Sequence, residues 1–117
     1  MELKIRRVGQ VTVCSPDQPK LDATNASDLK REFLRIFVEE TPRIILDLKN
    51  ISYVDSTGLG AILFGVRNSK NYAGQIKLVN PQPKVQKLID IAQLQRVLEI
   101  FPSVEDALAS FGEKSNP

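Results

Sequence analysis

Residues 44–67 read IILDLKNISYVDSTGLGAILFGVR, and this stretch decides the fold. Its first part belongs to the segment RIILDLKNI, which is short and rich in branched apolar residues, as is typical of a buried strand. After the polar motif DST, apolar residues recur with the period of one helical face through about Lys70: Leu59, Ile62, Leu63 and Val66. The stretch therefore predicts a strand, a loop that carries an acid and two hydroxyls, and then a helix.

The segment before this stretch predicts a hairpin and a helix. The residues LKIRRVGQVTVCS, at 3–15, indicate two strands that meet at Gly9 and Gln10. The prolines in PDQPKLDAT, at 16–24, favour a loop without regular structure. Thr24 or Asn25 is suited to cap the following helix, with Asp28 three residues after Asn25. We expect that helix to end at Thr41-Pro42.

The segment after this stretch repeats the alternation of strand and helix. QIKLVN at 75–80 and RVLEIF at 96–101 predict strands, and Pro81 and Pro83 open the helix between them. Ser103, with Asp106 three residues later, predicts a capped final helix. This order is typical of an α/β fold with a mainly parallel sheet and right-handed crossovers. We expect one domain over residues 1–112 and a disordered tail at 113–117.

The composition narrows the range of functions. The chain has 117 residues, with 16 basic and 14 acidic side chains interleaved along it, so no basic stripe points to nucleic acid. Without histidine it cannot form a Ser-His-Asp triad, and with one cysteine the usual zinc sites are lost too. That residue, Cys14, lies in an apolar run and is expected to be a small buried side chain. The longest nearly uncharged apolar run, GLGAILFGV, is far shorter than a membrane span, and the first ten residues contain no apolar core of a signal peptide, so we expect a cytoplasmic protein.

The DST motif fits none of the common catalytic or phosphate-binding patterns. A dinucleotide-binding fingerprint would need glycine at Leu63, and a P-loop would need lysine at Val66. A nucleophile elbow would need glycine at Val54, two residues before Ser56. Two interpretations stay open: Asp55 or Ser56 simply caps the helix, or Ser56 presents a hydroxyl that a kinase can reach.

Small residues are frequent in the helix that follows the motif. Each glycine there lowers the helix propensity by about 1 kcal/mol relative to alanine. We therefore expect that the helix backbone approaches either the sheet or a partner protein closely at these positions: Gly58, Gly60, Ala61 and Gly65.

The sequence of residues 44–67 resembles the central signature of STAS domains, specifically of the bacterial anti-sigma factor antagonists. The segment KLDATNASDLKREF, at 20–33, is similar to the first loop and helix of that family. The segment QIKLVNPQPKVQKLIDIAQLQRVLEIFPSVEDAL, at 75–108, is similar to its strand, helix, strand and closing helix. The resemblance implies an N-terminal β-hairpin joined to a mixed, mainly parallel sheet of about five strands, with about four helices.

The resemblance also implies a function that is not enzymatic. Such an antagonist binds an anti-sigma factor that is a serine/threonine kinase, and this binding releases a sigma factor for transcription. The kinase phosphorylates the first serine of the motif, here Ser56, which ends the interaction, and a PP2C-type phosphatase restores it. Asp22 and Asp55 match acidic positions beside that serine. Together with Thr57, Gly58 and Leu59 they are the predicted partner-binding residues, and we expect no metal, cofactor, nucleic acid or membrane to be bound.

Several alternatives remain at the level of sequence. Thr57 is a rival phosphate acceptor, and Asp22 can instead organise the turn before Thr24. Leu59 and Ile62 would be contact points if they were exposed and core residues if they were buried, and we expect Ile62 in the core. The alternative function is a STAS scaffold that binds other signalling proteins or a small ligand without phosphorylation.

Overall fold

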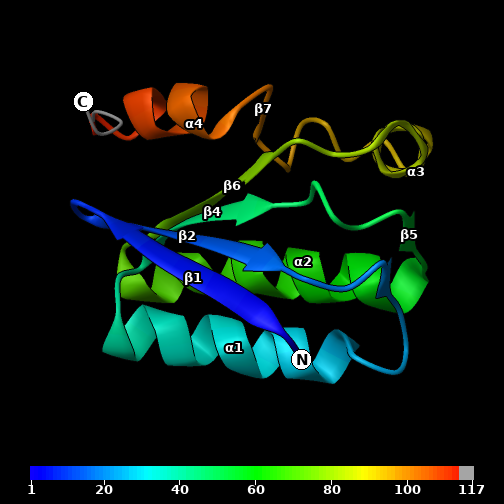
Figure 1. Ribbon diagram of the computed structural model, residues 1–117, viewed down its shortest axis with the longest axis horizontal. Helices are drawn as coiled ribbons and strands as arrows, with labels where there is room; N and C mark the ends of the chain where they lie inside the picture. Colours follow the sequence, from blue (N-terminus) through cyan, green and yellow to red (C-terminus); the bar gives the residue numbers. More distant parts are fainter. Residues whose placement is uncertain (114–117) are drawn as a thin grey trace.

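A five-stranded sheet forms the centre of the computed structural model, which describes residues 1–113 (Figure 1). Its spatial order is β1-β2-β4-β6-β7. The strands are β1 (Leu3–Val8), β2 (Val11–Pro16), β4 (Arg43–Asp47), β6 (Gln75–Val79) and β7 (Ile100–Phe101). β1 and β2 are antiparallel, and every other pair in this sheet is parallel. The predicted hairpin and mainly parallel sheet are confirmed, with Gly9 in the turn at a φ of +57°.

Helices cover both faces of the sheet. α1 (Ala26–Glu39) and α2 (Ser56–Ser69) lie side by side on one face, whereas α4 (Val104–Ser110) lies on the other (Figure 1). α3 (Pro83–Ile91) lies at the end of the sheet where β4 and β6 finish. A short 3₁₀ helix, η1 (Lys70–Tyr72), continues α2. No helix in the described part of the chain is both long and apolar enough to cross a membrane.

A second, two-stranded sheet was not predicted from the sequence. β3 (Lys20–Leu21) pairs in parallel with β5 (Tyr53–Val54), so part of the segment expected to be a loop is a strand. The prolines allow this because Pro16 is the last residue of β2 and Pro19 lies just before β3. This ribbon places the residues that follow β3 beside those that follow β5.

The ends of the helices and strands agree with the sequence prediction in part. Asn25, one of the two predicted residues, is the N-cap of α1. Its side chain makes no capping hydrogen bond and instead accepts one from the Asp22 N–H and donates one to the Lys20 carbonyl. Of the predicted strand at 96–101, only the last two residues pair with β6. The Ser103 cap is confirmed, because its hydroxyl accepts a hydrogen bond from the Asp106 N–H at 3.1 Å.

The apolar side chains form two cores, one on each face of the sheet. The larger core lies under α1, α2 and α3 and includes Cys14, as predicted, while the smaller one lies under α4. Gly65 explains how α2 reaches this larger core, because a Cβ there would lie 2.5 Å from Cδ2 of Phe33. The predicted tail lies outside the described residues except for Glu113, whose carboxylate accepts a hydrogen bond from the Gln10 N–H at 3.2 Å.

Candidate functional site

Asp55 caps the N-terminus of α2, so the choice between Asp55 and Ser56 as the cap is settled by geometry. Asp55 has an extended backbone, and its Oδ1 accepts a hydrogen bond from the Gly58 N–H at 2.9 Å. The same oxygen accepts a second hydrogen bond from the Thr57 hydroxyl at 2.6 Å. The helix start is therefore held without any contribution from the side chain of Ser56.

The hydrogen bonds to Asp55 lower the pKa of its carboxyl group. The Thr57 hydroxyl is the strongest cause of a lowered pKa, followed by the Gly58 N–H. Weaker contributions come from the backbone N–H groups of Ala23 and Thr57, and slight burial acts in the opposite direction. An aspartate is ionised at neutral pH, so Asp55 places a negative charge next to Ser56, and the lowered pKa extends this charge to more acidic conditions.

Ser56 is the first residue of α2 and is exposed. Within residues 1–113 its hydroxyl makes no hydrogen bond, whereas the two nearest hydroxyls are both engaged. The Thr57 hydroxyl donates to Asp55, and the Ser52 hydroxyl donates to the Pro19 carbonyl at 3.2 Å. Of these three hydroxyls near the start of α2, that of Ser56 is therefore the one without a hydrogen-bond partner among the described residues.

Asp22 lies at the end of the same ribbon as Asp55. Its Oδ1 accepts hydrogen bonds from the N–H and the hydroxyl of Thr24, at 3.0 and 2.5 Å, so it does organise the turn before α1. Leu21 pairs with Val54, and the Asp55 N–H donates to the Leu21 carbonyl at 3.2 Å. The two acids thus follow directly after paired strands, which brings both to the edge where α2 begins.

Gly58 and Leu59 lie beneath this edge. Gly58 is buried against β3, and Leu59 is only 9% exposed and belongs to the larger core. Ile62 is fully buried, as expected. Because Gly58 and Leu59 are buried, the predicted site residues that reach the surface are half-buried Asp22 and Asp55 and exposed Ser56 and Thr57.

Comparison with known proteins identifies the family. The pattern of the STAS domain family matches residues 2–107. The chain belongs to the STAS domain family. The anti-sigma-B factor antagonist of Bacillus subtilis is 34% identical over 75 residues, which are 64% of this chain and 69% of that protein. This STAS domain is therefore a member of the anti-sigma factor antagonist family, as its sequence resemblance indicated.

Solved structures agree with the predicted STAS fold. The crystal structure of the Thermotoga maritima protein TM1081 has a TM-score of 0.85 and 24% identity, with 92% of each chain covered. The unphosphorylated form of the anti-sigma factor antagonist SpoIIAA has a TM-score of 0.76 and 23% identity, covering 95% of this chain and 97% of that one. The phosphorylated form of SpoIIAA from Bacillus has a TM-score of 0.70 and 22% identity, covering 94% and 99%.

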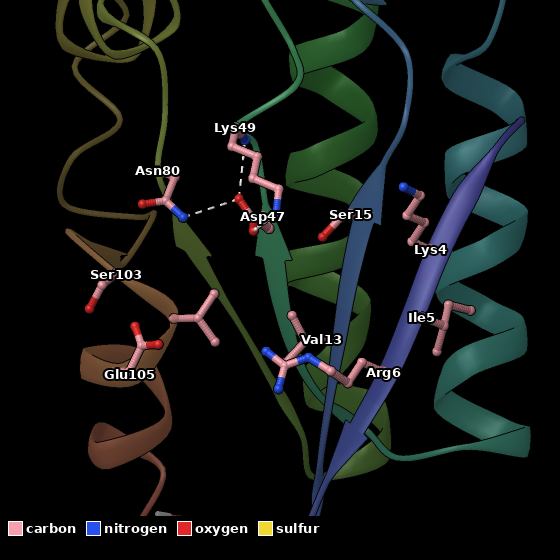
Figure 2. A pocket seen from close by; sticks show the side chains of 11 residues that line it. Lys4, Ile5, Arg6, Val13, Ser15, Asp47, Lys49, Asn80, Ser103 and Glu105 are labelled. Carbon is pink, nitrogen blue, oxygen red and sulfur yellow. Dashed lines mark hydrogen bonds and ion pairs between the residues drawn. The ribbon is translucent and has the colours of Figure 1, made fainter. Parts of the chain in front are cut away.

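The STAS domain also has a polar hollow of about 510 Å³ on the face of the sheet that carries α4 (Figure 2). Buried Asp47 lies in it and accepts hydrogen bonds from the Lys49 N–H and the Asn80 amide, at 3.1 and 3.2 Å. Lys49 Nζ lies 3.6 Å from the other carboxylate oxygen, and Lys4 and Arg6 line the wall formed by β1. Sequence reasoning missed this hollow, although polar residues at the ends of two neighbouring parallel strands, Asp47 and Asn80, were a usable signal.

Proposed function

We propose that this STAS domain is an anti-sigma factor antagonist that binds an anti-sigma factor with serine/threonine kinase activity and thereby releases a sigma factor. In this proposal the kinase transfers the γ-phosphoryl group of ATP to Ser56, and the phosphorylated domain no longer binds. The observation that carries the proposal is the exposed, unbonded hydroxyl of Ser56 beside a cap that Asp55 already provides. The named function of the Bacillus subtilis relative, and the existence of a phosphorylated SpoIIAA, support it.

In this proposal the added charge requires no change of fold. A phosphoserine carries a charge of about −1.5 to −2. At the first residue of α2 it lies near backbone N–H groups and the positive end of the helix dipole, which favour an anion. The fold can therefore stay the same while the electrostatic potential of the surface changes.

The change in surface potential would act on the binding partner. Asp22 and the ionised Asp55 already make the edge negative, and the phosphate adds to them. Repulsion between the phosphate and a partner carboxylate at about 5 Å amounts to one to several kcal/mol, depending on the local dielectric. Because about 1.4 kcal/mol is a tenfold change in affinity, a loss of about a hundredfold or more follows without a conformational change.

The remaining parts of the proposal follow from this switch. A PP2C-type phosphatase removes the phosphate from Ser56 and restores binding. The domain acts by binding alone and uses no catalytic residue, metal or cofactor, in the cytoplasm where the sigma factor acts. Its partners are proteins, and neither nucleic acid nor a membrane is part of the mechanism.

Phosphate mapping and affinity measurements test the proposal. Each candidate kinase from the same genome is incubated with the domain and ATP, the phosphate is located by mass spectrometry, and the dissociation constant is measured by calorimetry. We expect phosphate on Ser56, wild-type affinity but no phosphorylation for Ser56→Ala, and weaker binding for Ser56→Asp. Thr57→Ala is the matched control and should still be phosphorylated on Ser56. Phosphate on Thr57, or equal affinities of wild type and Ser56→Asp, would count against the switch.

A second candidate function is the binding of a small anionic ligand, without phosphorylation, in the hollow of Figure 2. It is favoured by the three basic side chains that line the hollow, Lys4, Arg6 and Lys49, which outnumber its two carboxylates, Asp47 and Glu105. This candidate predicts no phosphate on Ser56 with any kinase of the genome. It also predicts that a bound anion shifts the NMR signals of β1 and of the loop after β4, rather than those of the start of α2.

A further inference from the structure

A mainly apolar groove of about 310 Å³ lies between β5 and α3. Two of the most exposed large apolar side chains in the described part of the chain border it: Tyr53 is 51% exposed and Ile91 is 70% exposed. Half-buried Leu88 and buried Val54 lie between them. Neighbouring apolar side chains left open to water in this way are typical of a surface that another molecule covers.

The rim of the groove is positively charged. Lys84, Lys87, Leu88 and Ile91 follow the i, i+3, i+4, i+7 spacing, so they share one face of α3. Both lysines are exposed, and neither takes part in the ion pairs found among the described residues.

The nearest acid on α3 is Asp90, three residues after Lys87, and it lowers the positive charge on that side of the helix. Its carboxylate accepts a hydrogen bond from the Gln86 amide at 3.0 Å. No acidic residue lines the groove. A third lysine, Lys20, is the cross-strand neighbour of Tyr53 in the ribbon of β3 and β5. The groove therefore combines an apolar floor with a cationic border.

The groove is continuous with the edge that carries Ser56. Tyr53 and Val54 are the whole of β5, and Asp55 and Ser56 follow them directly in the chain. A protein large enough to phosphorylate Ser56 while bound would extend over the neighbouring surface, because a stable interface buries about 800 Å² on each partner.

We propose that this groove docks an acidic amphipathic segment of the anti-sigma factor partner, with apolar side chains placed between Tyr53 and Ile91 and carboxylates against Lys84 and Lys87. The inference rests on the proposed function and adds a second point of contact to it. It also supplies a reason for the strength of the switch. Carboxylates that are attracted to the lysines of the groove are the groups that a phosphate on adjacent Ser56 would repel.

The test uses the kinase that phosphorylates Ser56 and measures its dissociation constant by calorimetry at low and high salt. We expect Ile91→Ser and Tyr53→Ser each to weaken binding at least tenfold, because central apolar and aromatic side chains dominate interface affinity. The double variant Lys84→Glu/Lys87→Glu should weaken it at least tenfold at low salt, with a smaller effect at high salt.

Two matched controls lie at the opposite end of the molecule. Val38→Ser alters an apolar side chain that is 71% exposed near the end of α1. Lys70→Glu reverses a charge in η1. Both should bind within about twofold of wild type. All variants are compared by thermal unfolding, so that a loss of binding is not confused with a loss of fold.

The outcomes separate the groove from the proposed function. If Ser56→Asp weakens binding but the groove variants do not, the inference about the groove is overturned and the proposed function stands. Absence of binding by wild type to every candidate kinase overturns the proposed function and the groove with it. Sedimentation of wild type as a dimer and of Ile91→Ser as a monomer would assign the groove to a second copy of this chain, and that result also overturns the inference.

Discussion

Gly58 lies so close to the carbonyl oxygen of Leu21 that a Cβ at position 58 would be 2.2 Å from it. This contact joins the first turn of α2 to β3, and the N–H of Asp55, which follows β5, donates a hydrogen bond to the same carbonyl. Ser56 is thus displayed on a loop whose base is fixed by backbone atoms on two sides. A rigid base matters because a switch that acts through charge needs the phosphate to appear at a constant place on the surface.

Gly58→Ala should destabilise the fold, because a backbone oxygen is the atom that must move. Overpacking of this kind costs about 1–3 kcal/mol, which outweighs the gain of about 1 kcal/mol in helix propensity over most of that range. Gly60→Ala is the matched control, since nothing lies within 4 Å of a Cβ at that position, and it should raise the free energy of unfolding by about 0.4–1 kcal/mol. Urea denaturation of both variants measures the difference. Equal changes in the free energy of unfolding would show that the close contact with Leu21 does not affect stability.

Ser56→Ala should leave the free energy of unfolding within about 0.5 kcal/mol of wild type, because the lost hydroxyl is exposed and makes no hydrogen bond. Thr57→Ala removes the hydrogen bond to Asp55 and should be the more destabilising of the two. Thermal unfolding of the two variants tests this order. If Ser56→Ala proved the worse, the hydroxyl of Ser56 would have a structural role that conflicts with its proposed function.

The long patterned segments of this fold were predictable from sequence. Residues 43–51 and 56–70 carry their apolar periodicity over a whole strand and several helical turns, so the strand, the helix and their order were found. The family resemblance then indicated about five strands for the central sheet and about four helices, as the structure has them.

The ribbon of β3 and β5 could not be predicted in the same way. Two residues are too few to show a period, and the pairing of Lys20 with Tyr53 joins positions 33 apart in sequence. The groove was missed for the same reason, because Tyr53 and Ile91 come together only through the fold.

The helix cap shows a second limit of sequence reasoning. Asp55 and Ser56 are adjacent, and both are residue types that favour the N-cap. The Gly58 N–H and the Thr57 hydroxyl both reach Asp55, and this detail of three-dimensional geometry decides that Ser56 is free.

The stability of the domain should depend on Asp55 in acid. Its pKa is lowered in the folded state, so its contribution is complete above the ordinary value of about 3.9 and is lost as the pH falls through the lower folded-state pKa. Asp55→Asn keeps an oxygen that can cap α2 but cannot titrate. The melting temperatures of the two proteins should therefore differ by a constant amount above about pH 5 and converge or cross in acid. A difference that stays constant down to pH 2 would mean that the carboxylate gains nothing from Thr57 and Gly58.

Cys14 should be inert in the native protein. Burial raises the pKa of its thiol to about 12, and the nearby charges of Glu32 and Asp47 act in the same direction. Because the thiolate is the reactive form, a disulfide reagent at pH 8 should label Cys14 only when the domain opens, at a rate that rises with urea as the unfolded fraction grows. Ser15→Cys is the matched control, because Ser15 is half-buried and lines the polar hollow. The thiol introduced at position 15 should react at once, while that of Cys14 in the same protein should react slowly. Rapid labelling of Cys14 in the absence of urea would mean that β2 separates from α1 far more readily than the packing of the larger core allows.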